Sequence, residues 1–246
     1  MSIAGEYASL AMYPFDALRP AWERLWAAVT DRVDWAPRTL RWDGDVQQHW
    51  TDPSCTVAHG CGYPVAATLD DRAVVGAFAL RLPDADGHRY RSVLVSRGAG
   101  TRLAANSDDS LSGWISALAT IDVDEVTFTG SHEASLEALA GGVADIAMID
   151  ALTFAHLTRL RPELTAGVDE IGHGPWIPSP PIVVPVATPQ ERVDELRAAF
   201  ADALASDDDL RATLLLDGFV PLERTDYLPV LGLVDLRARP WPSSSP

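Results

Sequence analysis

The fold is decided by the stretch Thr129-Gly130-Ser131-His132-Glu133-Ala134-Ser135-Leu136-Glu137-Ala138 and by a second stretch shortly after it, Ala144-Asp145-Ile146-Ala147-Met148-Ile149-Asp150. The first follows a strand pattern over 125–129 and continues from a Gly-Ser-His turn into an amphipathic helix predicted over 131–141. The second predicts a strand over 145–149 that ends in a carboxylate. Together they form a βαβ unit with polar groups at both strand ends. Parallel α/β sheets bind ligands at the carboxyl ends of their strands, so we expect a binding site here.

A hydroxyl-rich turn lies just upstream, Asn106-Ser107-Asp108-Asp109-Ser110-Leu111-Ser112-Gly113. The pattern predicts a strand over 103–106 before it and a helix over 112–120 after it. A helix N-terminus offers unpaired N–H groups, serine hydroxyls add donors, and glycine lets a ligand approach the backbone. Ser110, Ser112 and Gly113 are therefore candidate anion-binding residues, with ordinary N-capping by serine as the alternative.

The rest of the chain alternates strand and helix patterns. Strands are expected at 7–12, 39–42, 54–58, 73–80, 90–96 and 182–186, and helices at 18–30, 152–161, 190–206 and 208–217. Turns are expected at 60–64, 84–87 and 175–181, and a loop over most of 34–53. The residues 241–246 are expected to form a disordered tail. This alternation predicts an α/β fold with mainly parallel sheets. We expect two lobes, a discontinuous one made of 1–89 and 185–246 and a second one made of 90–184.

Composition and charge exclude several classes of protein. The chain has 246 residues with a formal net charge of −16, and all 19 basic residues are arginine. A nucleic-acid-binding protein needs a basic face, so we expect no nucleic-acid partner. The sequence has no run of about 18 apolar residues, so we expect no membrane span.

Neither the cysteines nor any known motif predicts a metal or a cofactor. Cys55 and Cys61 are the only cysteines, and free or buried thiols are favoured over a disulfide. The sequence lacks phosphate-binding, dinucleotide-binding and zinc motifs. The first residues lack the features of a signal peptide, which predicts a cytoplasmic protein as written and a periplasmic or extracytoplasmic one if the given start omits a signal.

Five motifs occur in an order that resembles a known family. They are Cys61-Gly62-Tyr63-Pro64, Tyr90-Arg91-Ser92-Val93-Leu94-Val95, the turn from Asn106 to Gly113, Gly130-Ser131-His132-Glu133-Ala134-Ser135 and Ala144-Asp145-Ile146-Ala147. In this order they resemble the phosphate/phosphite/phosphonate-type substrate-binding proteins of ABC transporters, from Ala8 to about Tyr227. The resemblance implies a two-lobed type II periplasmic-binding-protein fold, with two crossover strands and a ligand cleft between the lobes that closes by a hinge.

The resemblance also adds candidate site residues. It implies a binding histidine at the Gly-Ser-His turn, so His132 is expected to contact the anion, with a surface or capping histidine as the alternative. Ser131 beside it is expected as a ligand contact or as the helix cap. It implies an acid at Asp150 that holds a ligand amine; the alternative is a cap for the next helix. Three tyrosines are candidates from their positions in the sequence, not from the resemblance. Tyr13 and Tyr63 follow strands of the first lobe and Tyr90 begins the first crossover, so each is expected to hydrogen-bond or stack on the ligand, with core packing as the alternative.

The function predicted from these observations is capture of a small oxyanion for an ABC transporter. The ligand is expected to resemble phosphonate or phosphate and to carry an amine, because an acid near an anion otherwise lacks a neutralising partner. An ABC permease is the expected partner, and the protein is expected to be a monomer without catalytic activity. The alternative is a cytosolic enzyme of cofactor biosynthesis, with His132 or Cys61 as the reactive group, or a ligand sensor on the same fold.

Overall fold

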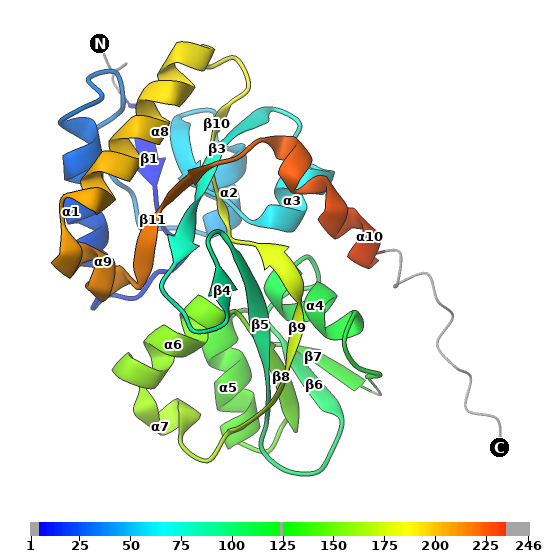
Figure 1. Ribbon diagram of the computed structural model, residues 1–246. Coiled ribbons are helices and arrows are strands. Elements are labelled where there is room, and N and C mark those ends of the chain that lie inside the picture. The colour runs from blue at the N-terminus through cyan, green and yellow to red at the C-terminus, as the bar shows by residue number, and fades with distance from the viewer. Residues whose placement is uncertain (1–4, 124, 235–246) are drawn as a thin grey trace. The chain divides into compact units, whose positions relative to one another are not determined.

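The computed structural model describes residues 5–123 and 125–234 (Figure 1). Its contacts divide the chain into two compact units. The first unit contains the described residues up to Tyr90 together with Pro178–Tyr227, and the second contains Arg91–Ile177 together with the described residues from Leu228 onward. The predicted tail at 241–246 lies outside the described residues.

A five-stranded mixed sheet forms the centre of the first unit. Its order is β1 (Tyr7–Ser9), β2 (Cys55–His59), β10 (Pro181–Pro185), β3 (Arg72–Leu80) and β11 (Leu216–Pro221). β1 and β2 are parallel, whereas β10 is antiparallel to both of its neighbours and β11 is antiparallel to β3. The prediction of a mainly parallel sheet is therefore wrong for this unit, because strands that return late in the chain enter it in the opposite direction.

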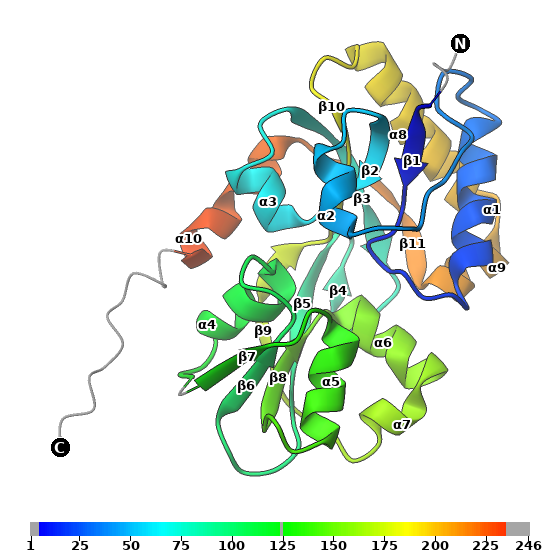
Figure 2. The ribbon, with the colours of Figure 1, turned by 180° about the vertical axis from the view of Figure 1, so that it is seen from behind.

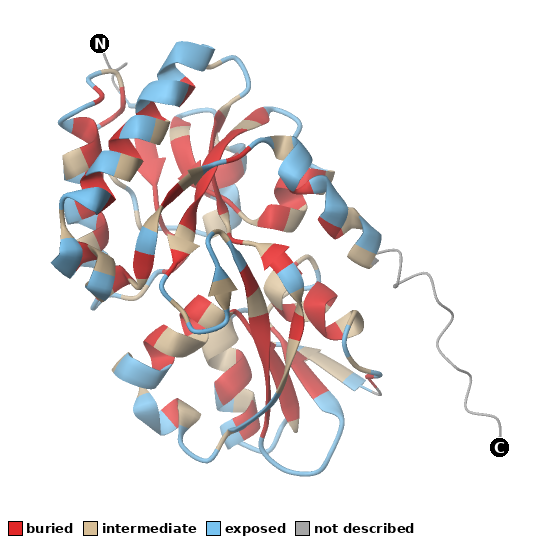
Figure 3. Cartoon of the chain, in the orientation of Figure 1, coloured by how far each residue is buried: buried red, intermediate tan, exposed pale blue. Residues whose placement is uncertain are grey.

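Helices pack on this sheet through an aromatic core. The helices are α1 (Arg19–Thr30), α2 (Val46–Thr51), α3 (Gly62–Ala67), α8 (Gln190–Ala205) and α9 (Asp208–Leu214). Phe200 of α8 stacks on Phe219 of β11 with ring centroids 4.9 Å apart, and Phe78 of β3 contacts Trp22 of α1 at 5.6 Å. Figure 3 shows the result: the strands are mostly buried, while the helices expose one side.

Three local predictions in the first unit are wrong. The loop predicted over 34–53 contains α2, which begins where Asp45 caps Gln47, and its predicted strand at 39–42 is a single bridge from Leu40 to Ala8. The turn predicted at 60–64 becomes the start of α3, because proline is tolerated in the first turn of a helix. The helix predicted over 208–217 ends at Leu214, since the following residues pair with β3 as β11.

The other sheet has six strands. They are β4 (Ala85–Asp86), β5 (Arg89–Ser96), β8 (Ile146–Ile149), β6 (Arg102–Ala105) and β7 (Glu125–Phe128) in that order, with β9 (Asp169–Pro178) paired to β5. β6 is parallel to β7 and to β8, whereas β5 is antiparallel to β8. The proline-rich turn predicted at 175–181 is wrong, because those residues complete β9 and begin β10. β9 lies at an edge, where Pro175 and Pro178 are tolerated, and Pro181 is the first residue of β10, another position that tolerates proline.

The second unit contains a π-helical turn and several helices. A π-turn (Leu111–Ile115) runs directly into α4 (Ser116–Leu118), and the others are α5 (His132–Ala140), α6 (Ala151–Leu160), α7 (Pro162–Thr165) and α10 (Leu231–Val234). Figure 2 shows α5 next to β8, and the two elements are in contact. Of the predicted apolar face of α5, Leu136 and Leu139 are buried, whereas Ala140 and Val143 are exposed.

Two further observations apply to the described part of the chain. No helix there is long and apolar enough to cross a membrane. Cys55 and Cys61 are not joined by a disulfide, and burial raises the pKa of the Cys55 thiol to about 12.

Candidate functional site

The candidate site lies at one rim of the sheet in the second unit. β6, β7 and β8 run in the same direction, so the residues that follow their carboxyl ends meet at the same edge. After β6 the chain enters the turn that leads to Ser110, after β7 it reaches the Gly-Ser-His turn, and after β8 it reaches Asp150. The predicted site residues of this unit therefore follow three adjacent strands.

The turn after β6 is wider than the predicted α-helix over 112–120. The backbone N–H of Ile115 donates to the carbonyl of Ser110 at 3.0 Å, a span of five residues. Ser110 is buried, and its Oγ atom accepts a hydrogen bond from the backbone N–H of Gly113 at 3.0 Å. A turn with five-residue bonds leaves one more N–H without an intrahelical partner at its start than an α-helix does, and such turns are frequent at functional sites.

Asn106 forms one wall of this turn, and the sequence prediction did not include it. A Cβ atom on Gly113 would overlap with the Asn106 amide oxygen. That oxygen is buried and has no hydrogen-bond partner among the described residues, while the Asn106 carbonyl accepts a bond from the N–H of Gly130 at 2.9 Å. Its position at the end of the predicted strand 103–106, just before the hydroxyl-rich turn, is the signal that could have identified it.

His132 connects the second turn of the site to the first. Its Nε2 atom lies 3.1 Å from the Oγ atom of Ser112, so side chains from two different helix starts are in hydrogen-bond contact. The Nδ1 atom is buried and has no partner in the described structure. Burial lowers the pKa of His132, and the negative charge of Asp150 acts in the opposite direction. The imidazole therefore favours its neutral form until more negative charge approaches it.

Ser131 and Asp150 both cap helices. The Ser131 Oγ atom accepts from the N–H of Ala134 at 3.0 Å, at the start of α5. Asp150 is 4% exposed, and its Oδ1 atom accepts from the N–H of Thr153 at 2.8 Å, at the start of α6. Ser131 and Asp150 thus act as the helix caps that the sequence offered as alternatives to ligand binding. A contact of either side chain with a ligand stays a prediction.

The three predicted tyrosines belong to the first unit. Tyr13 is buried, with its ring stacked on Trp22 at a centroid distance of 6.4 Å. Tyr90 is buried in β5, and Tyr63 is half-buried in α3. The contact between Ser112 and His132 in the second unit therefore involves none of the three tyrosines. A contact of the tyrosines with a ligand stays a prediction.

Other polar groups have different surroundings. Asp145 accepts two hydrogen bonds from the Arg102 guanidinium, at 2.9 Å each, so this carboxylate connects β6 to the start of β8.

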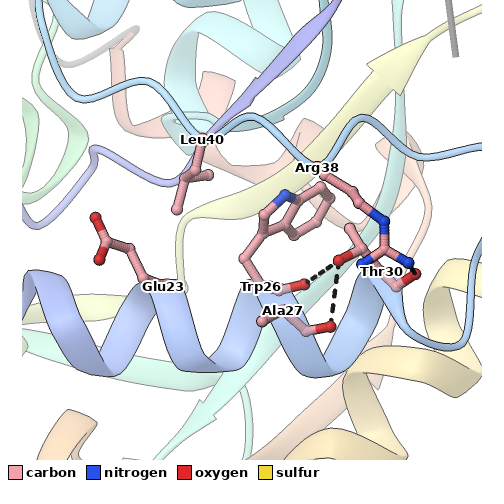
Figure 4. A pocket seen from close by; sticks show the side chains of 6 residues that line it. All are labelled: Glu23, Trp26, Ala27, Thr30, Arg38 and Leu40. Atoms are coloured by element: carbon pink, nitrogen blue, oxygen red, sulfur yellow. Dashed lines mark hydrogen bonds between the residues drawn. The ribbon is translucent and has the colours of Figure 1, made fainter.

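Among the described residues, no group of three or more His, Cys, Asp or Glu side chains could hold a metal ion. Figure 4 shows a pocket in the first unit, beside α1, and none of its lining residues is a predicted site residue. They are Glu23, Trp26, Ala27, Thr30, Arg38 and Leu40.

Solved structures show the fold to which the chain belongs. A binding protein component of an ABC phosphonate transporter from Pseudomonas aeruginosa has a TM-score of 0.75 at 16% identity, over 96% of this chain and 86% of its own. PhnD1 from Prochlorococcus marinus in complex with methylphosphonate has a TM-score of 0.74 at 13% identity, over 95% and 98%. A Xanthomonas citri protein bound to ATP has a TM-score of 0.63 at 13% identity, over 95% and 96%.

The family follows from the sequence itself. Comparison with curated proteins gives no match. Residues 54–227 match the family described as "ABC transporter, phosphonate, periplasmic substrate-binding protein". Together with the solved structures, this match confirms the predicted two-lobed type II periplasmic-binding-protein fold and the predicted capture of a ligand for an ABC transporter, and it does not favour the enzyme or sensor alternative. The chain therefore belongs to the periplasmic substrate-binding proteins of phosphonate ABC transporters.

Proposed function

We propose that Ser110, Ser112 and His132 bind the oxyanion group of a phosphonate ligand at the rim of the second unit. The observation that carries this proposal is the 3.1 Å contact between Ser112 Oγ and His132 Nε2. This contact joins the start of the π-turn to the start of α5, and each start offers N–H groups and a partial positive charge to an anion. The hydroxyl of Ser112 and the imidazole of His132 then act as additional donors.

Asp150 supports a ligand of mixed charge. Burial lowers the pKa of the His132 imidazole, and the negative charge of Asp150 opposes that shift, so Asp150 also acts on an anion bound by His132. Two negative groups near each other repel unless a positive charge is placed between them. We therefore propose that the ligand carries a protonated amine as well as the phosphonate, and that Asp150 accepts a hydrogen bond from that amine.

Isothermal titration calorimetry with a short series of ligands tests this proposal. We expect 2-aminoethylphosphonate to bind more tightly than methylphosphonate, and methanesulfonate to bind weakly. A ligand that binds only the folded protein at a hundred times its Kd stabilises it by about 2.7 kcal/mol, so a thermal shift should accompany binding. If none of the phosphonates binds, the proposal is wrong.

Two variants locate the binding to this rim. Ser112→Ala and His132→Ala should each weaken phosphonate binding by about tenfold or more, because each removes a donor to a charged group. Ser107→Ala is the matched control: it lies in the same turn, but its hydroxyl donates to Asp109 at 2.7 Å. Equal losses in all three variants would show that the turn is disturbed as a whole and would contradict a specific role for Ser112.

The same family assignment suggests how the protein is used. The family is periplasmic, and we propose that this chain also works in the periplasm, as a monomer, and delivers its ligand to an ABC permease. We further propose that it returns the ligand chemically unchanged. Phosphorus NMR of a phosphonate incubated with the protein should then show a single unaltered resonance, and a new resonance would indicate turnover. Size-exclusion chromatography with light scattering tests the monomer.

A further inference from the structure

The hydroxyl of a buried serine on β5 lacks a partner in the described structure. Ser92 is 0% exposed, and its Oγ atom accepts or donates no hydrogen bond among the described residues. A hydroxyl buried in this way has lost its bonds to water without replacing them, which destabilises the folded protein. Buried polar atoms of this kind are rare in native proteins, and a role in binding is one reason for their presence.

The register of the sheet places Ser92 next to Asp150. β5 and β8 are antiparallel, and Val93 lies opposite Ile149. Continuing this register by one residue brings Ser92 opposite Asp150. Side chains directly opposite each other point to the same face of a sheet, with Cβ atoms about 5 Å apart. The register therefore places the Cβ atoms of Ser92 and Asp150 close to each other.

Both side chains lie on the face of the sheet that packs against α4. Leu94 and Met148 are two residues along from Ser92 and Asp150, and residues two apart in a strand share a face. Leu94 and Met148 belong to one buried cluster with Ala117 of α4. Since α4 continues directly from the π-turn, Ser92 and Asp150 lie on the side of the sheet where the proposed anion site is built.

The strand order extends this relation along the whole rim. Across β5, β8, β6 and β7 in turn, the rim carries Ser92, Asp150, Asn106 and then His132. Three of these four contribute a buried atom without a partner in the described part of the chain: Ser92 Oγ, Asn106 Oδ1 and His132 Nδ1. Unsatisfied polar atoms thus occur in a row at one edge, next to Ser112.

We propose that Ser92 determines specificity at this site: its hydroxyl and the Asp150 carboxylate together bind a hydrogen-bond-donating substituent, an ammonium or a hydroxyl, on the carbon chain of the phosphonate. The proposal rests on the proposed function of the Ser112–His132 pair. A carboxylate only accepts hydrogen bonds, whereas a serine hydroxyl both accepts and donates. The pair can therefore accept two hydrogen bonds from an ammonium, or accept one from a ligand hydroxyl and donate one to its oxygen. A methyl group satisfies neither side chain.

The test compares Ser92→Ala with the wild type on three ligands by isothermal titration calorimetry. We expect Ser92→Ala to bind 2-aminoethylphosphonate, 2-hydroxyethylphosphonate or both about tenfold more weakly, because one hydrogen bond is lost, and methylphosphonate equally well. The melting temperature of the ligand-free variant should stay the same or rise, because the unsatisfied hydroxyl is gone. Ser92→Cys keeps the size of the side chain with a weak donor and should show the same loss of discrimination.

Ser116→Ala is the matched control. Ser116 is as buried as Ser92 and packs on the same glycine: a Cβ on Gly174 would lie 3.2 Å from the Ser116 Cβ and 3.5 Å from the Ser92 Cβ. Its hydroxyl, however, donates to the carbonyl of Leu111 at 2.7 Å. We expect Ser116→Ala to lower the melting temperature and to preserve the ratio of affinities among the three ligands.

The outcomes separate this inference from the function on which it rests. If the wild type binds the phosphonates and both Ser92 variants retain its discrimination, the role of Ser92 is overturned and the proposed function stands. An equal loss for all three ligands overturns it as well, because a general disturbance does not depend on the substituent. If the wild type binds none of the three, the proposed function itself fails. A selective loss for 2-aminoethylphosphonate identifies the bound substituent as an ammonium, and a selective loss for 2-hydroxyethylphosphonate identifies it as a hydroxyl.

Discussion

The amide oxygen of Asn106 occupies the space that a Cβ atom on residue 113 would need. Gly113→Ala therefore has to displace Asn106 or open the π-turn. We expect a loss of about 1–3 kcal/mol in the free energy of unfolding and a loss of phosphonate binding of tenfold or more. Chemical denaturation and calorimetry measure the two effects. Gly218→Ala is the control, because nothing lies within 4 Å of a Cβ there; similar effects of both variants would contradict the packing argument.

The affinity for phosphonate should rise as the pH falls, through His132. In the ligand-free protein, burial keeps the pKa of His132 below its ordinary value of about 6.5. A bound anion favours the imidazolium and raises that pKa, so the complex takes up a proton. The affinity then increases by up to about tenfold per pH unit as the pH falls through the pKa of the complex, and it levels off below the pKa of the free protein.

His132→Gln isolates this effect from protonation of the ligand itself. The variant keeps a hydrogen-bond donor but does not titrate, so its pH profile reports only the ligand and the remaining residues. Calorimetry in buffers of different ionisation enthalpy should show proton uptake in the wild type that exceeds uptake in the variant. Identical uptake would mean that His132 does not change its protonation on binding.

A second histidine should make the stability of the fold depend on pH. His59 is buried among the rings of Tyr13, Trp22 and Phe78, and burial lowers its pKa to about 3. The unfolded chain binds a proton at about pH 6.5, so stability is lost as the pH falls below that value, down to about 3. Between pH 7 and 4 the loss from this residue is about 3 kcal/mol. Denaturation of His59→Phe should show a smaller decline over this interval than the wild type does.

Arg72 should be essential for the stability of the first unit. Its guanidinium donates to three backbone carbonyls, those of Trp50 at 2.7 Å, Cys55 at 2.6 Å and Asp52 at 2.9 Å, and the residue is buried. A lysine ammonium cannot reproduce this planar arrangement of donors. We expect Arg72→Lys to lower the free energy of unfolding by about 2–4 kcal/mol, because carbonyls lose their partners in the interior.

Exposed Arg19 supplies the control for that measurement. Its guanidinium donates to Asp16 at 2.9 Å at the surface, where ion pairs contribute little. Arg19→Lys should change the free energy of unfolding by less than about 0.5 kcal/mol. A comparable effect of the two substitutions would show that the buried carbonyl contacts are unimportant.

Local signals explain which elements could be predicted from the sequence. Helix α5 was predicted to within a residue at each end, because Ser131 caps it and apolar residues follow at helical spacing. β9 and β11 were missed, since glycine and proline in them are typical of turns. Their pairing with β5 and β3 depends on residues far away in the chain, which a local pattern does not contain.

The same distinction applies to the candidate site. Ser110, Ser112, His132 and Asp150 were candidates because each lies where a predicted strand ends or a predicted helix begins. Asn106 and Ser92 were not. The unsatisfied oxygen of Asn106 is visible only in the packed turn, and Ser92 becomes relevant only through the register that aligns β5 with β8.

The π-turn after β6 has a consequence for how the chain tolerates change in length. Each residue in an α-helix advances the backbone by about 100° around the helix axis. Deleting one residue between Leu111 and Ile115 would convert the wide turn into an α-helical one and rotate Ser112 away from His132 by about that angle. A substitution in this segment therefore changes one side chain and leaves the path of the backbone in place. A single deletion would separate Ser112 from His132, whose side chains are 3.1 Å apart.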